Sequence, residues 1–337
     1  MRKCLFEHTN VYVRHFDGWC KDQGVTRQYN ETDDSLGERL LKLLQSKGGQ
    51  AGQYSSLFID EAQDFDESWF KCALGAMADP INGDLIVVAD GNQGLYRHRK
   101  FSWADVGIQA RGRTINTKFD LDKTYRSSRE IASLARAFAT GDDGDAEAAI
   151  ASMTIDPEKC VRANGHKPIL VQAVNHQDEC NCAGAIVAEL LAGKWFGRDI
   201  EAPLHPSEIG ILYPRANEDD KELIPKLREE IGPAIWINRN SDSRERINED
   251  GVKIQTIHSA KGLQYKAVIV IWAGLMSATF GQIDPVTERK LMFVGLTRAE
   301  DYLAVIYSPP GSLAMELEQT GEMDVLKTQT VMESLVR

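Results

Sequence analysis

The sequence has 337 residues, of which 42% are hydrophobic and 26% are charged. This balance is typical of soluble globular proteins, and the length suits two domains of ordinary size better than one small core. No apolar run reaches the roughly 18 residues that span a bilayer, and the sequence opens without a signal-peptide core. These features argue against a membrane protein and favour a cytoplasmic one.

The charge of the chain is negative but unevenly distributed. The net charge is −11, whereas residues 97–129 hold nine lysines and arginines against three aspartates, a net charge of +6. An acidic protein with one basic stretch can still bind a polyanion, because the local field governs contact. A solvated surface is the simpler explanation, so the pattern alone leaves both interpretations open.

The six cysteines are scattered along the chain. Cys180 and Cys182 are close together, but no second pair follows at zinc-ligand spacing. Reduced thiols in a cytoplasmic protein are therefore the simpler interpretation, and a zinc site is the minor alternative.

The first half of the sequence contains two short apolar runs that each end in acidic residues. These runs lie at 57–59 and 85–89, and a helical pattern at 68–78 separates them. The order predicts parallel strands, with ligands at the carboxyl edge of their sheet. The other elements expected in this half are a short strand at 11–16 and helices at 36–44 and 129–139.

A second α/β unit is expected after the loop at 141–166, which is rich in glycine and aspartate. Its predicted strands are 169–174, 209–213, 234–237, 252–256, 267–272 and 302–307. Helices are predicted near 178–192, 219–231 and 285–299. The domains expected from this pattern are 1–140, 141–310 and a C-terminal tail at 311–337.

Two adjacent carboxylates, Asp60 and Glu61, follow the first apolar run directly. The first carboxylate of such a pair can hold Mg²⁺, and the second can take a proton from an attacking water. Nucleotide-driven motors use this arrangement. An ordinary acidic loop is the competing interpretation. A nuclease that also uses Asp64 is weaker still, because no further ligand cluster completes a two-metal site.

Gln93 lies three residues after Asp90, just past the next predicted strand. An amide at this place can contact a terminal phosphate, although a turn rich in glycine and asparagine is the simpler explanation. The next segment interleaves aromatic and cationic side chains, which can stack on bases and hold phosphates together. Its candidates for nucleic-acid contact are Tyr96, Arg97, Arg99 and Trp103, of which Trp103 can equally anchor a core.

Two arginines and a polar loop complete the candidate set. Arg126 lies just before a predicted helix, and Arg298 lies at the end of another. Between them, residues 252–265 run from a strand into a polar loop. Taken singly, each arginine is most simply a surface residue.

Taken in order, these segments resemble motifs II to VI of the UvrD, Rep and PcrA helicases of superfamily 1. Residues 11–20 also resemble the aromatic segment known as motif Ib. The resemblance extends over roughly residues 11–307, and five motifs in the right order are highly specific. It implies an α/β fold with two RecA-like domains of the P-loop NTPase type, the first one incomplete. The five segments are 60–64, 87–96, 121–128, 252–265 and 293–299.

The resemblance implies ATP-dependent movement on single-stranded DNA, or unwinding at a duplex junction, usually 3′ to 5′. Asp60 and Glu61 would hold Mg²⁺, and Glu61 would activate the hydrolytic water. Gln93 would contact the γ-phosphate of ATP, while Arg126 and Arg298 would stabilise charge on the transferring phosphoryl group. The remaining implied contacts are Gly262 and Gln264 with the nucleotide, and Tyr96, Arg97, Arg99, Trp103, Thr256 and His258 with DNA.

The largest departure from the family is the absence of a glycine-rich phosphate loop. The pattern Gly-x-x-x-x-Gly-Lys-Ser/Thr does not occur in the sequence. We therefore expect the chain to begin after the strand that carries this loop, and to be inactive by itself. Smaller departures are Ala89, Gln264 and Gly295.

The spacing of the predicted strands also limits insertions. Only about 40 residues lie between the strands at 209–213 and 252–256. We expect one helix and one strand there, and no large inserted subdomain.

An ATP-independent module that binds DNA or a partner protein is the competing hypothesis. Against it, Glu61, Gln93, Arg126 and Arg298 all keep side chains that phosphoryl transfer can use.

Overall fold

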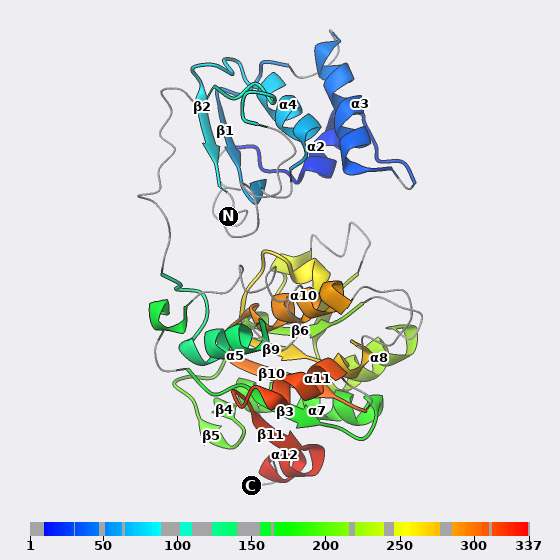
Figure 1. Ribbon diagram of the computed structural model, residues 1–337. Coiled ribbons are helices and arrows are strands. Elements are labelled where there is room, and N and C mark those ends of the chain that lie inside the picture. The colour runs from blue at the N-terminus through cyan, green and yellow to red at the C-terminus, as the bar shows by residue number, and fades with distance from the viewer. Residues whose placement is uncertain are drawn as a thin grey trace. The chain divides into compact units, whose positions relative to one another are not determined.

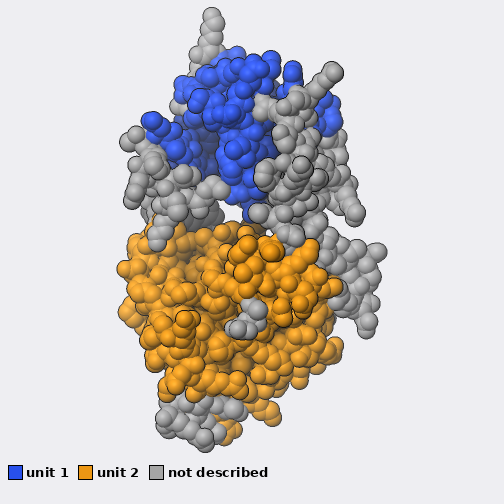
Figure 2. Space-filling view, turned by 90° about the vertical axis from the view of Figure 1, so that its left-hand side faces the viewer, with its two compact units in different colours: residues 1–120 blue, residues 121–337 orange. Residues whose placement is uncertain are grey.

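The chain of the computed structural model divides into two compact units, residues 1–120 and 121–337 (Figure 2). Each unit has a hydrophobic core of its own. The structure describes residues 10–29, 31–46, 51–62, 65–88, 102–109, 123–139, 156–162, 165–215, 220–238, 246–276, 285–309 and 312–335.

Unit 1 contains a pair of parallel strands and the helices that pack beside them. Strands β1 and β2 pair with Ile59 opposite Val87, which confirms the predicted parallel order. The chain therefore leaves both strands at the same edge of the sheet. The described elements are α2 (Phe16–Asp22), α3 (Asp33–Gln45), β1 (Ser56–Ile59), α4 (Glu67–Gly75) and β2 (Asp84–Val87).

The strand predicted at 11–16 is wrong. Residues 11–15 have no regular structure, and α2 begins at Phe16. Phe16, Trp19 and Cys20 are all buried. Their spacing of three and four residues is the period of a helix, so the alternation of the preceding residues does not decide the structure.

Close packing between aromatic rings and a glycine joins the helices of unit 1. Phe16 stacks on Trp69 with ring centroids 3.9 Å apart, and Phe65 meets both rings edge to face. Gly37 of α3 lies against α4, where a Cβ atom would come within 2.1 Å of the Ser68 hydroxyl oxygen. The close approach of α3 to α4 therefore requires glycine, which has no side chain, at position 37.

One face of the sheet in unit 1 carries exposed apolar side chains. Phe58 of β1 and Ile86 of β2 lie opposite each other, and they are 46% and 54% exposed. Parallel sheets normally have both faces covered by other elements. This face is therefore able to accept further polypeptide.

Unit 2 is built on seven parallel strands in the order β11-β3-β10-β9-β6-β8-β7 (Figure 1). All six predicted strands appear, and the predicted α/β fold class with parallel sheets is confirmed. Every residue of β6 is buried, as expected of a central strand with both faces covered. The strands are β3 (Ile169–Gln172), β6 (Ile209–Tyr213), β7 (Ala234–Ile237), β8 (Val252–Thr256), β9 (Tyr265–Val270), β10 (Ala299–Tyr307) and β11 (Asp324–Lys327).

Helices cover both faces of the large sheet. Apolar side chains of α7 and α8 pack on one face, and those of α5, α10 and α11 pack on the other. The helices are α5 (Arg129–Ala139), α7 (His176–Leu191), α8 (Asp220–Ile231), α10 (Pro285–Leu296), α11 (Ser312–Gln319) and α12 (Thr328–Leu335). Smaller elements are the hairpin β4 (Lys194–Trp195) and β5 (Arg198–Asp199), and the 3₁₀ helices η4 (Pro157–Lys159), η5 (Pro206–Glu208), η6 (Arg246–Asn248), η7 (His258–Ala260) and η8 (Ala273–Leu275).

The compact units divide between residues 120 and 121, whereas the sequence suggested a boundary after residue 140. The reason is α5, whose apolar side chains are buried in the core of unit 2. The expected tail at 311–337 also belongs to this unit, because β11 extends the sheet beside β3. Between β6 and β8 the described residues form α8, β7 and η6, which agrees with the one helix and one strand expected there.

Gly37→Ala should destabilise unit 1. Forcing a methyl group into a packed contact costs about 1–3 kcal/mol, whereas alanine gains only about 1 kcal/mol over glycine within a helix. Denaturant titration of the full chain, followed by tryptophan fluorescence, measures the loss. Gly75→Ala is the matched control, because a Cβ there meets nothing within 4 Å. Equal stability of the Gly37 variant and the parent would contradict the packing argument.

Candidate functional site

The acidic pair of unit 1 lies at the carboxyl end of β1, as predicted. Both Asp60 and Glu61 are exposed, and the Glu61 N–H donates to Asp60 Oδ1 at 3.1 Å. Glu61 has φ of 54°, a left-handed conformation that costs a residue with a side chain about 1–2 kcal/mol. Beyond it, the Ala62 N–H donates to the Val88 carbonyl at 3.0 Å. The kinked strand end thus presents two carboxylates to solvent, where they can hold a hydrated cation.

Most of the predicted contacts that follow β2 lie outside the described residues, namely Gln93, Tyr96, Arg97 and Arg99. Trp103 is described. Its ring meets Phe70 edge to face at 5.8 Å, and it packs against a buried cluster that includes Val106 and Ile108. These contacts are those of a core anchor, which was the alternative interpretation for Trp103.

In unit 2, the loop 256–264 leads from the end of β8 to the start of β9. Thr256 Oγ1 donates to Ser259 Oγ at 2.8 Å and accepts from the Ser259 N–H at 3.1 Å, so its hydroxyl bonds to both the side chain and the main chain of Ser259 in η7. His258 is exposed. Gly262 turns the chain with φ of 80°, a conformation that favours glycine. The loop therefore presents one imidazole to solvent from a fixed backbone.

Arg298 fastens this loop to the end of α10. Its side chain is largely buried, with 9% of the residue exposed. Nε donates to the Val294 carbonyl at 3.0 Å, and Nη1 donates to the Leu263 carbonyl at 3.4 Å. A cation at this helix end also lies favourably in the helix dipole. The Arg298 carbonyl in turn accepts from the Tyr265 N–H at 3.1 Å. Arg298 therefore bonds to the end of the loop through its side chain and to the start of β9 through its main chain.

Gln264, next to Leu263 in the same loop, has a buried polar atom. Its Nε2 has no hydrogen-bond partner among the described residues. A buried donor left in this state costs about 1–3 kcal/mol. A ligand hydroxyl or carbonyl at this place would offset that cost.

The segment with Arg126 lies beside the start of β10, close in structure to Arg298. The Ser128 N–H donates to the Glu300 carbonyl at 2.8 Å, and Ser128 Oγ accepts from the Ile131 N–H at the start of α5. Arg126 lies two residues before Ser128, and Arg298 lies two residues before Glu300, so this bond brings the two arginines close in structure. Arg126 is exposed, whereas Arg298 is not. Unit 2 therefore brings both arginines and the loop 256–264 into one region.

Sequence reasoning missed Glu179, a fully buried carboxylate at the start of α7. Glu179 Oε2 accepts from the Trp272 N–H at 2.6 Å, and Oε1 accepts from Ser308 Oγ at 2.6 Å. His176 Nδ1 lies 3.0 Å from the same Oε1. The carboxylate thus joins α7 to the chain just after β9 and β10. The only sequence signal was an acidic residue within a mostly apolar helix.

The described cysteines are buried free thiols. Burial raises the pKa of Cys180 and of Cys182 to about 12, so both stay protonated near neutral pH. Within the described ranges, no group of three His, Cys, Asp or Glu side chains is arranged to hold a metal ion. Nor does any helix in these ranges have the length and apolar character needed to cross a bilayer.

Residues 233–309 match the family described as UvrD-like helicase C-terminal domain. The match includes the loop 256–264 and Arg298, and it supports a helicase-related function. Asp60, Glu61 and Arg126 lie outside it. No curated protein matches the chain.

The solved structures that match the chain include two distant ones. One is the C-terminal domain of a possible DNA helicase from Lactobacillus plantarum WCFS1, with 17% identity and a TM-score of 0.38 over 60% of this chain and 98% of that one. The other is a DEAD box protein from the hyperthermophile Methanococcus jannaschii, with 14% identity and a TM-score of 0.31 over 86% of this chain and 64% of that one.

Glu179→Gln should destabilise unit 2 by about 1–3 kcal/mol. The amide has only one acceptor oxygen, so either the Trp272 N–H or the Ser308 hydroxyl loses its acceptor. Thermal unfolding of the full chain measures the effect. Glu229→Gln is the control, since Glu229 is exposed on α8 and surface substitutions usually change stability by less than about 0.5 kcal/mol. Equal unfolding temperatures for the two variants would show that the buried carboxylate contributes nothing.

Proposed function

We propose that this chain is part of an ATP-dependent DNA helicase or translocase of the UvrD type. One observation carries the proposal: the residues that match the family include two segments that are hydrogen-bonded to each other. Residues 233–309 include both the loop 256–264 and Arg298, and Arg298 ties the loop to α10 through hydrogen bonds to main-chain carbonyls. A cytoplasmic location is part of the proposal and fits the free thiols.

In each unit, the candidate residues have side chains whose chemistry suits a magnesium nucleotide. When bound, Mg²⁺ and ATP supply the phosphoryl group whose transfer to water releases energy. Asp60 would hold the cation, and Glu61 would accept the proton of the attacking water. Arg126 and Arg298 would offset negative charge on the phosphates. The unpaired amide of Gln264 would donate to the nucleotide.

A motor built on this chain needs a phosphate loop from additional polypeptide. The sequence has no Gly-x-x-x-x-Gly-Lys-Ser/Thr pattern. The exposed apolar face of β1 and β2, with Phe58 and Ile86, is a surface on which such polypeptide can pack. By itself, the chain should bind ATP weakly, because its main phosphate contacts are missing.

The second candidate is an ATP-independent module that binds single-stranded DNA or a protein. The missing phosphate loop favours it. The two candidates differ in their response to nucleotide: a motor hydrolyses ATP faster when DNA is bound, whereas the module binds DNA equally with and without ATP.

Glu61→Gln should reduce DNA-stimulated ATP hydrolysis by about 10²–10⁴-fold, because an amide cannot take the proton from water. Hydrolysis is measured in an assembly of this chain with polypeptide that supplies the phosphate loop. Glu67→Gln is the matched control, since Glu67 pairs with Lys71 on the surface of α4. Undiminished hydrolysis by the Glu61 variant would remove the base assignment. No hydrolysis by the unsubstituted assembly would favour the ATP-independent module.

His258→Ala should weaken binding of a labelled single-stranded oligonucleotide by roughly 5–150-fold, which corresponds to the loss of one base stacked on a ring. Fluorescence anisotropy of the full chain at fixed salt measures the affinity. His205→Asn serves as control, because His205 is exposed at the start of η5 and asparagine also caps helices. If both variants bind DNA like the parent, His258 has no role in DNA contact.

A further inference from the structure

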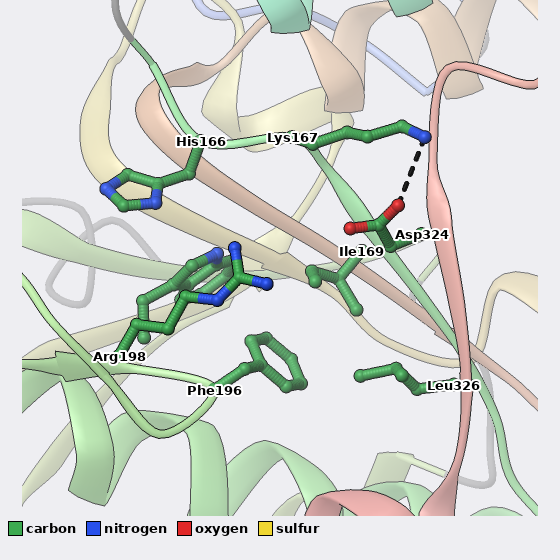
Figure 3. A pocket seen from close by; sticks show the side chains of 8 residues that line it. His166, Lys167, Ile169, Phe196, Arg198, Asp324 and Leu326 are labelled. Atoms are coloured by element: carbon green, nitrogen blue, oxygen red, sulfur yellow. Dashed lines mark ion pairs between the residues drawn. The ribbon is translucent and has the colours of Figure 1, made fainter.

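Unit 2 contains a cavity of about 190 Å³ at the amino end of β3. The side chains of Ile169, Phe196 and Leu326 are turned toward this space (Figure 3). Ile169 belongs to the core on the α7 face of the sheet, and Phe196 and Leu326 pack against that core. Arg298, in contrast, follows α10, which packs on the opposite face. The cavity is therefore separate from the candidate nucleotide site.

The rim of the cavity is cationic. Lys167 pairs with Asp324 at 3.1 Å, whereas Arg198 has no ion-pair partner among the described residues. Burial and the nearby charge of Arg198 lower the pKa of His166, so its ring stays neutral near pH 7. Among the residues that line the cavity, two cations against one carboxylate leave a net charge of +1, in a chain whose net charge is −11. The carboxylates of Glu130 and Asp301 also lie near His166. This local excess favours an acidic ligand.

A strained hairpin turn forms one wall of the cavity. Strands β4 and β5 are joined by Phe196 and Gly197, which have φ of 48° and 74°. Two positive φ angles are typical of the type I′ turn, which prefers Asn-Gly. The Gly197 N–H donates to Glu189 Oε1 of α7 at 3.0 Å. A phenylalanine stands where asparagine would be less strained, and its ring faces the cavity (Figure 3).

The size of the cavity limits its occupant. A dry cavity of about 150 Å³ is enough to hold benzene, whereas sites for small molecules and cofactors usually measure about 300–1,000 Å³. The space is large enough for one aromatic side chain. Arg198, at the rim, is available to a carboxylate next to that side chain.

We propose that this cavity binds a partner protein through one aromatic side chain flanked by acidic residues. The aromatic ring enters between Ile169, Phe196 and Leu326, and a neighbouring carboxylate pairs with Arg198. The site does not depend on the proposed motor activity, because none of these residues lies in the loop 256–264 or contacts Arg298.

The test uses a fluorescein-labelled peptide, Asp-Asp-Phe-Asp-Asp, titrated with the full chain at low salt. We expect saturable binding that weakens at least tenfold when the peptide phenylalanine is replaced by alanine. Phe196→Asn should weaken binding at least fivefold while keeping the fold, because it creates the preferred Asn-Gly turn. Arg198→Glu should weaken binding at least tenfold. Arg228→Glu is the matched control, since Arg228 is exposed on α8 and lies outside the cavity.

Several outcomes would overturn the proposal. One is no binding of the peptide at millimolar concentration, and another is equal binding by the parent and the Phe196 and Arg198 variants. Equal affinity for the alanine peptide would remove the aromatic anchor. A labelled five-nucleotide single strand is tested in parallel. If it binds and loses affinity in the same two variants while the peptide does not bind, the site belongs to nucleic acid.

Discussion

The candidate site of unit 2 depends on a single buried guanidinium. Arg298 donates to carbonyls of α10 and of the loop 256–264, and its own carbonyl holds the first residue of β9. The guanidinium whose charge the proposed chemistry needs therefore also holds the loop 256–264 against α10. Removing it would move the loop as well as the charge, so a loss of activity could not be assigned to either effect. Glu61, in contrast, is exposed at a strand end of unit 1.

Other buried polar side chains fix the positions of the helices that pack on the large sheet. Arg289 of α10 donates to the Phe138 carbonyl at 2.9 Å and stacks over the Phe138 ring, which fixes α10 against α5. Glu179 does the same for α7, because it accepts from donors that follow β9 and β10. Hydrophobic burial alone would allow these helices to slide along the sheet. Such directional bonds in a low-dielectric core restrict them to one register.

Most strands of unit 2 were predictable because they are short, largely apolar runs, and predicted helices separate three pairs of consecutive strands. The hairpin β4–β5 and the strand β11 were missed, since β4 and β5 have only two residues each and β11 is largely exposed. The position of Asp60 and Glu61 followed from the strand before them. The contact of Arg298 with Leu263 and the burial of Glu179 did not, because both join segments far apart in sequence.

The uncovered face of β1 and β2 has a consequence during synthesis. Unit 1 leaves the ribosome before unit 2, and domains generally begin to fold as they emerge. Phe58 and Ile86 remain exposed even after unit 1 has packed its own aromatic cluster. A nascent chain with such a surface attracts chaperones and other unfinished chains. Recombinant yield should therefore depend on what shields this patch in the cell.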